Sequence, residues 1–193
     1  EMFVDPNDER NHLGRNQMDR DSTDHNRYKP TARISRNVKD EGLEPALKPK
    51  SEVQDVVIIY LIAKQGTVIE GKKLLQQLLN LGLRFGEMDI FHRHEKANSK
   101  GCLMFSVANI EEPGTFDLDH IEDFSTPGIC LFLSLPGPKR SMYAFDLLVD
   151  TARKVSNALD CDMLDEKREV MTQQSIEQYR QRVMEFERSP RPA

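Results

Sequence analysis

Apolar residues are distributed very unevenly along this chain of 193 residues. In residues 1–52 they are scattered at no regular spacing, so neither a helix face nor a strand face is specified. Charges in this stretch nearly balance, with ten Lys and Arg against eleven Asp and Glu. Such a segment buries too little apolar surface to offset its chain entropy, which predicts a disordered, charged linker over 1–52 and a folded domain over 53–189.

Four apolar segments of the predicted domain have the composition of strands. Residues 56–63 form an uninterrupted apolar run rich in β-branched side chains, which predicts a central strand. The other expected strands cover 85–94, 101–109 and 129–135. The sequence Asn-Ser-Lys-Gly at 98–101 predicts a turn that joins two of them as an antiparallel hairpin.

Three further segments have helical periodicity. Leucines recur on one face of 70–81, and Gly82 follows as the residue that ends the helix. Apolar residues recur at intervals of three and four in 141–159, and Thr172 is expected to cap a last helix. A short hairpin around 165–167 is expected between these two helices. The order β-α-β-β-β-α-β-β-α predicts a two-layer α+β domain, a mostly antiparallel sheet with its helices on one face.

The face of the sheet without helices bears on what the domain does. In 129–135 the odd-numbered residues are aliphatic and should face the helices, which leaves Phe132 on the opposite face. Alternation assigns Leu103 to the helix side, and it assigns Met88 and Ile90 there too, although a register step of one residue would reverse this. The opposite face would be lined by Val57, Ala108, Ile110 and Phe132. A shallow apolar strip of this kind is typical of a partner surface, while burial against 1–52 or against a second copy is an equal alternative.

Composition excludes several classes of protein. A net charge of −5 argues against a general binder of nucleic acid or of anionic membranes. The longest apolar run has eight residues, against about 20 for a membrane-spanning helix, and residues 1–10 do not resemble a signal peptide. Three widely spaced cysteines favour free thiols in a reducing compartment. The chain starts with Glu rather than Met, which is compatible with a fragment of a longer protein.

Candidate chemistry is sparse. No catalytic or phosphate-binding motif occurs, so neither an enzyme activity nor a cofactor is expected. His92 and His94 have a spacing that some metal sites use, but no third ligand is evident, so no metal site is expected. Residues 99–105 are similar to the start of an RNA-recognition motif, which stacks bases on sheet-face aromatic residues. Cys102 and Met104 occupy those places in an acidic domain, so a single-stranded-RNA-binding module is kept only as an alternative hypothesis.

Several short motifs resemble the C-terminal domain of the bacterial cell-division protein family ZipA. They are FGEMDIFHRH at 85–94, FSVAN at 105–109, PGTFD at 113–117, FSTPG at 124–128, LDE at 164–166 and MT at 171–172. They occur in family order and at family-like spacing between about Asp55 and Phe186. The resemblance implies a split β-α-β fold with a six-stranded antiparallel sheet, three helices on one side and a shallow apolar cleft on the other.

The resemblance also implies a function. Proteins of this family carry an N-terminal membrane helix, a long flexible linker and this cytoplasmic domain, which binds the C-terminal tail of the tubulin-like division protein FtsZ. The implied role is a non-enzymatic adaptor that tethers FtsZ polymers to the cytoplasmic face of the inner membrane at the division septum. The domain is expected to be monomeric, with no nucleic-acid partner, and to reach the membrane only through an N-terminal anchor outside this chain.

The family's cleft residues can be carried over position by position. The cleft would include Val57, Met88, Ile90, Ala108, Ile110 and Phe132, with Arg168 at its rim. Met88 and Ile90 would then face the ligand and Phe91 the core, against the alternation argument above. Glu112 stands where better-known members have a basic residue, which changes the charge at that edge of the cleft.

Overall fold

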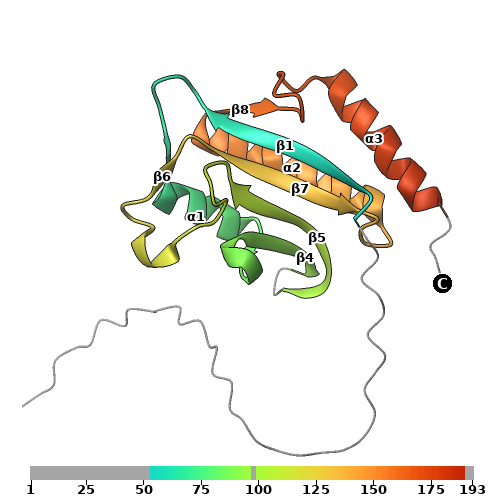
Figure 1. Cartoon of the computed structure of the whole chain (residues 1–193), viewed down its shortest axis with the longest axis horizontal. Coiled ribbons are helices and arrows are strands. Elements are labelled where there is room, and N and C mark those ends of the chain that lie inside the picture. Colours follow the sequence, from blue (N-terminus) through green and yellow to red (C-terminus); the bar gives the residue numbers. More distant parts are fainter. Residues whose placement is uncertain (1–52, 97–98, 190–193) are drawn as a thin grey trace, which may run out of the picture. The chain divides into compact units, whose positions relative to one another are not determined.

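A computed structural model describes residues 53–96 and 99–189 (Figure 1). The linker predicted over 1–52 and the first residue of the turn predicted at 98–101 lie outside the described residues. The described residues form a six-stranded antiparallel sheet in the order β3-β4-β5-β7-β1-β8, together with three α-helices. The predicted fold class, a two-layer α+β domain, is confirmed.

The elements follow the sequence pattern closely. The strands of the large sheet are β1 (Asp55–Ala63), β3 (Arg84–Phe85), β4 (Phe91–Lys96), β5 (Lys100–Asn109), β7 (Gly128–Leu135) and β8 (Cys161–Leu164). A separate two-stranded sheet pairs β2 (Ile69–Glu70) with β6 (Ser125–Thr126). The helices are α1 (Gly71–Asn80), α2 (Ser141–Leu159) and α3 (Gln173–Arg188), and two short 3₁₀ turns, η1 and η2, cover Glu87–Asp89 and Leu118–His120.

Two of the helix ends form at residues that local chemistry favours. Gly82 adopts a φ of +83° just after α1, a left-handed conformation that glycine accepts without strain. At the start of α3 the Thr172 side chain accepts a hydrogen bond from the Ser175 amide, and Ser175 reciprocates as in a capping box. Each helix buries its apolar stripe in a single hydrophobic core that it shares with one face of the sheet.

The predicted strand 85–94 is wrong as a single element. It is divided into β3, the turn η1 and β4, because Met88 and Asp89 have φ values of 61° and 55°. Left-handed residues cannot continue a strand, and the apolar pattern does not reveal them because their cause is not local. The turn places Met88 at the surface with 71% of its area exposed.

The predicted orientation of two residues is also wrong. Val57 is completely buried in the helix-side core, whereas Ile58 and Tyr60 alternate with it and point to the opposite face. Leu103 is 47% exposed, and Met104 is buried in its place, because a register shift between β4 and β5 at Arg93 and His94 reverses the alternation beyond it. In a strand that is apolar on both faces, like β1, the alternation of side chains does not indicate which residues face the core.

Within the described ranges, no helix combines the length and the apolar character needed to cross a lipid bilayer.

Candidate functional site

On the face of the sheet opposite the helices, β1, β5 and β7 carry a continuous set of uncharged side chains, and Asp162 of β8 lies across from Ile62 at its edge. Antiparallel residues directly across from each other share a face, and the register aligns Ile58 with Phe132 and Ser106. The next row aligns Tyr60 with Cys130 and Ala108. We call the apolar members of this surface the open-face strip: Ile58, Tyr60, Ile62, Ala108, Ile110, Cys130 and Phe132.

Gly128 allows Ile62 and Ile110 to pack closely at one end of the open-face strip. A Cβ atom at this position would lie 2.7 Å from Cδ1 of Ile62 and 3.4 Å from Cγ2 of Ile110. The amide of Ile110 also donates to the Gly128 carbonyl at 3.1 Å. The two isoleucines therefore approach each other over a residue without a side chain, and the strip is continuous across β1, β7 and the end of β5.

Met88 and Ile90 lie at the β4 end of this surface. Ile90 is only 5% exposed, yet it is not part of the helix-side core, and the intervening Phe91 is. It is two residues from His92 along the chain, and His92 pairs with Ser106 on the open face. The orientation implied by the family resemblance, with Phe91 in the core, is therefore the one that the structure has.

Arg168 lies at the opposite edge of the strip. Its guanidinium carbon is 4.5 Å from the centroid of the Tyr60 ring, a cation–π geometry. Arg168 itself has a φ of 63° in a tight turn after β8. The carboxylate of Asp165 stabilises this turn by accepting hydrogen bonds from the amides of Lys167 and Glu169, at 2.9 and 3.0 Å.

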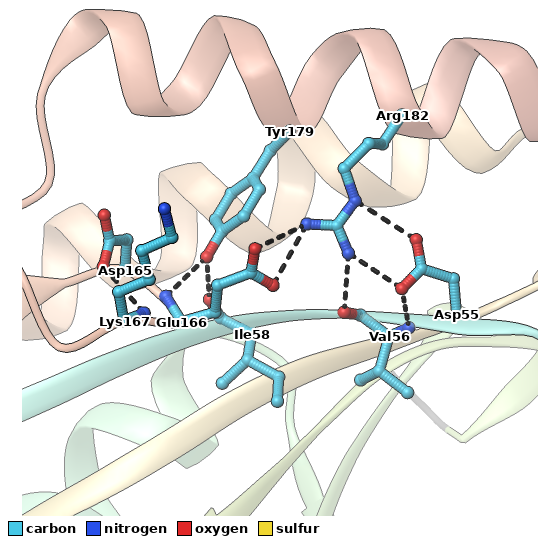
Figure 2. A network of polar contacts seen from close by, with 8 residues as sticks. All are labelled: Asp55, Val56, Ile58, Asp165, Glu166, Lys167, Tyr179 and Arg182. Carbon is cyan, nitrogen blue, oxygen red and sulfur yellow. Dashed lines mark hydrogen bonds and ion pairs between the residues drawn. The ribbon is translucent and has the colours of Figure 1, made fainter.

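Helix α3 holds the same turn from the other side, as Figure 2 shows. The Tyr179 hydroxyl accepts from the Glu166 amide at 2.7 Å and donates to the Ile58 carbonyl at 2.8 Å. Arg182 donates to both carboxylate oxygens of Glu166 at 3.0 Å and to Asp55 at 2.8 and 3.1 Å. β8 pairs with β1 only from Tyr60 onward, so these side chains satisfy carbonyls along the part of the β1 edge that has no strand partner.

The hydrogen-bond network around Tyr179 and Arg182 contains side chains whose pKa values are shifted. Desolvation by itself would raise the pKa of Asp55, but the hydrogen bonds from Arg182 and from the Val56 amide outweigh it and hold the pKa below the ordinary 3.8. Burial raises the pKa of the Tyr179 phenol to about 12, so it stays protonated and can keep donating to the Ile58 carbonyl. The turn that carries Arg168 is thus attached to both α3 and β1 at neutral pH.

A groove of about 750 Å³ adjoins the strip at the other end of β7. Its lining includes Val53, Met88, His94, Leu103, Phe132 and Pro136. Desolvation by burial is the main cause that lowers the pKa of His94, so its ring is neutral at pH 7. Apolar side chains thus line much of the groove, and Arg84 and Glu87 place one charge of each sign in its lining.

The described residues offer little for covalent or metal chemistry. Burial raises the pKa of the Cys130 and Cys161 thiols to about 11, which keeps both protonated and unreactive. Among the residues that the structure describes, no group of three His, Cys, Asp or Glu side chains is arranged to hold a metal ion.

The sequence-predicted site residues are mostly brought together. Met88, Ile90, Ala108, Ile110, Phe132 and Arg168 all lie on or at the edge of the open face. Val57 does not, because it belongs to the helix-side core, and Ile58 occupies the position expected for it. Sequence reasoning also missed Tyr60 and Ile62. The signal available was Tyr60 itself, since an amphipathic side chain in an otherwise aliphatic run favours the wetter face.

Comparison with known proteins identifies the family. Residues 55–182 match the family model described as "ZipA, C-terminal FtsZ-binding domain". The chain belongs to this family. Similar relatives are the cell division proteins ZipA of Ectopseudomonas mendocina (strain ymp), 47% identical over 164 residues, and of Stutzerimonas stutzeri (strain A1501), 48% identical over 149 residues. The ZipA of Pseudomonas fluorescens (strain SBW25) is 51% identical over 135 residues.

These alignments cover 82%, 77% and 70% of the chain, but only 60%, 55% and 47% of the respective relatives. The chain thus spans about half the length of the curated relatives it matches. The family match includes β1, the whole open face and most of α3.

Proposed function

We propose that this chain binds the C-terminal tail of FtsZ on the open-face strip and acts as a non-enzymatic adaptor in cell division. The single observation that carries the proposal is an apolar strip across β1, β5 and β7 of the open sheet face, with Arg168 at its edge, in a member of the ZipA family. A flat surface of this type suits an amphipathic peptide that inserts a few apolar side chains and keeps its polar side in water.

Charges at the two ends of the strip would favour one orientation of the bound peptide. Arg168 supplies positive charge beside Tyr60. Negative charge lies at the Ile62 and Ile110 end, where Asp162 is across from Ile62 and Glu112 is exposed beyond Ile110. A peptide that places an acidic residue near Arg168 and keeps acidic residues away from Glu112 would be favoured. A basic residue at position 112 would weaken this preference.

In the cell, the proposed role is to tether and stabilise FtsZ polymers at the cytoplasmic face of the inner membrane during septum formation. Affinity for one tail would be modest, but a polymer presents many tails to many tethered copies, and the raised effective concentration holds them together. A flexible chain of 52 residues would span roughly 40 Å, enough to let neighbouring copies engage one filament. The membrane attachment itself would be supplied by a segment outside this chain, and the domain would act as a monomer.

Calorimetric titration of the chain with a synthetic FtsZ C-terminal peptide tests the proposal. We expect measurable heat and a single site, with NMR shift changes at Met88, Ile110 and Phe132. The Phe132→Asp variant serves as the matched negative control. Absence of heat together with unchanged shifts at these three residues would refute peptide binding on this face.

The RNA-binding alternative receives no support from the open face. Met104, one of the two positions where an RNA-recognition motif would stack a base, is buried in the helix-side core. Filter binding to single-stranded RNA across a range of salt concentrations tests this directly, since true binding would weaken steeply with salt.

A further inference from the structure

The turn that presents Met88 is held in an unfavourable backbone conformation. Met88 and Asp89 both adopt left-handed φ values, 61° and 55°, which cost free energy for residues with side chains. Neither residue is a glycine, and Met88 is 71% exposed, so burial of its own side chain does not compensate. The surrounding structure must therefore hold the turn.

Backbone hydrogen bonds supply part of that restraint. The Gly86 amide donates to the Ile90 carbonyl at 3.0 Å, and the Asp89 amide donates to the Gly86 carbonyl at 3.2 Å. The Phe116 amide donates to the Asp89 carbonyl at 2.9 Å and so ties the turn to the loop before η2. These bonds hold both ends of the turn but leave the Glu87 carbonyl, next to Met88, to another partner.

His92 is that partner. Its Nε2 lies 2.8 Å from the Glu87 carbonyl oxygen, and because a carbonyl can only accept, Nε2 carries the proton and donates. Its Nδ1 lies 2.7 Å from Oγ of Ser106, so in the neutral ring the Ser106 hydroxyl donates to it. The His92 side chain is 8% exposed, which keeps water from competing for these bonds.

We propose that His92 is a positioning residue that sets the place of Met88 on the binding face. A chain of hydrogen bonds runs from Ser106 on β5 through the His92 ring on β4 to the Glu87 carbonyl in η1. It attaches the turn to the sheet and makes Met88 a preorganised anchor rather than a mobile one, which lowers the cost of ordering it on binding. The inference rests on the proposed function, because it concerns how the same face is built.

The same geometry explains one member of the His-Arg-His motif. Both ring nitrogens of His92 are already engaged, by a carbonyl and by a hydroxyl, so the ring is not available as a metal ligand in this arrangement. The histidine is required for its two-ended hydrogen bonding, which bridges two strands and a turn.

Two conservative substitutions distinguish the effects of the two hydrogen bonds that the His92 ring makes. His92→Gln can place an amide nitrogen near the position of Nε2 and keep the bond to Glu87. The shorter side chain of His92→Asn reaches only the position of Nδ1. It keeps the hydrogen bond to Ser106 but loses the hydrogen bond to the Glu87 carbonyl in the turn. Loss of one buried hydrogen bond corresponds to roughly three- to tenfold in affinity. We expect His92→Asn and His92→Leu to weaken FtsZ-tail binding by about this factor, and His92→Gln to stay within about twofold of the wild-type chain.

A double-mutant cycle with Met88→Ala tests whether His92 acts through Met88. If it does, His92→Leu should change affinity by less than about twofold in the Met88→Ala background. In the wild-type background it should weaken binding by the full factor of roughly three- to tenfold. Equal costs in the two backgrounds would overturn the proposal, as would a His92→Gln variant as weak as His92→Leu. Thermal melts of each variant exclude general unfolding as the cause.

A readout without peptide separates this inference from the proposed function. In the free protein, His92→Asn should shift the amide resonances of residues 87–89 and the Met88 methyl resonance, whereas His92→Gln should leave them near their wild-type positions. Unchanged shifts in His92→Asn would overturn the positioning role even if the tail binds. Failure of the wild-type chain to bind the tail would instead refute the proposed function and leave these ligand-free shifts as the test of the turn.

Discussion

Phe132 and its neighbour Leu131 offer a sharp test because they lie next to each other on β7 and face opposite sides of the sheet. Leu131 is completely buried under the helices, and Phe132 is half-buried on the open-face strip, opposite Ile58 and Ser106. We therefore expect Phe132→Asp to abolish FtsZ-tail binding while the domain stays folded. Leu131→Ala should have the reverse effect, a loss of stability with the face intact.

The magnitude for binding follows from the surface that the peptide would cover. Full burial of a Phe side chain is worth about 1.5–3 kcal/mol, and since Phe132 is already half-buried, the peptide adds about 1 kcal/mol. An aspartate in its place would lose this contribution and would also have to be desolvated against an apolar ligand, at a cost of at least about 2 kcal/mol. The sum, about 3 kcal/mol, corresponds to more than about a 100-fold increase in Kd.

The magnitude for stability differs between the two residues. Truncation of a buried leucine costs about 2–5 kcal/mol, and for a domain of this size each kcal/mol lowers Tm by about 4 °C. Leu131→Ala should thus lower Tm by roughly 8–20 °C. Phe132→Asp should lower it by less than about 4 °C, because its side chain is not part of the helix-side core.

Calorimetric titration with the tail peptide and thermal melts followed by circular dichroism measure the two quantities. Phe132→Ala provides a graded control, with an expected loss of only about fivefold in affinity, since it removes the contact without adding a charge. A drop in Tm for Phe132→Asp as large as that for Leu131→Ala would show that Phe132 is a core residue. Affinity within twofold of the wild-type chain would place the binding surface elsewhere.

Three other sites give predictions that can be checked with simple assays. Val57→Ala should destabilise the domain by about 2 kcal/mol in a thermal melt and leave tail affinity unchanged, while Ile58→Ala should weaken binding with little change in Tm. Arg182→Met should lower Tm by about 4 °C at pH 7. Because the pKa of Asp55 is lower in the folded than in the unfolded state, this stabilisation is complete above about pH 5 and is lost as pH falls through the folded pKa. The Tm difference should therefore shrink progressively in melts taken below pH 3.8. With its pKa raised to about 11, the Cys130 thiol should react with iodoacetamide at pH 8 on the order of 100-fold more slowly than a free thiol, and labelling at the free-thiol rate would contradict its burial.

The family resemblance and the alternation of side chains each predicted part of the site. Strict alternation predicted Phe132 and Ala108 on the open face, because β7 and the second half of β5 are regular and have one clearly aliphatic side. The same rule failed for Met88 and Ile90. A left-handed turn before β4 breaks the strand there. The alternation of side chains before the turn therefore does not predict which face the residues after it occupy.

The sequence by itself determined most of the elements, their order along the chain, and the apolar stripes that meet in one core. These depend on local periodicity, on capping residues such as Thr172 and on breaks at glycine, all of which act over a few positions.

Only the tertiary structure decided which side of β1 lies on the open face, where the alternation of β5 reverses and what holds Met88 and Arg168 in place. Each of these depends on contacts between distant segments: the pairing of Ile58 with Phe132, the bond from His92 to the turn, and the reach of Arg182 from α3 to Asp55. A strand that is apolar on both faces fits either register locally, and it is the choice of neighbours across the sheet that removes the ambiguity.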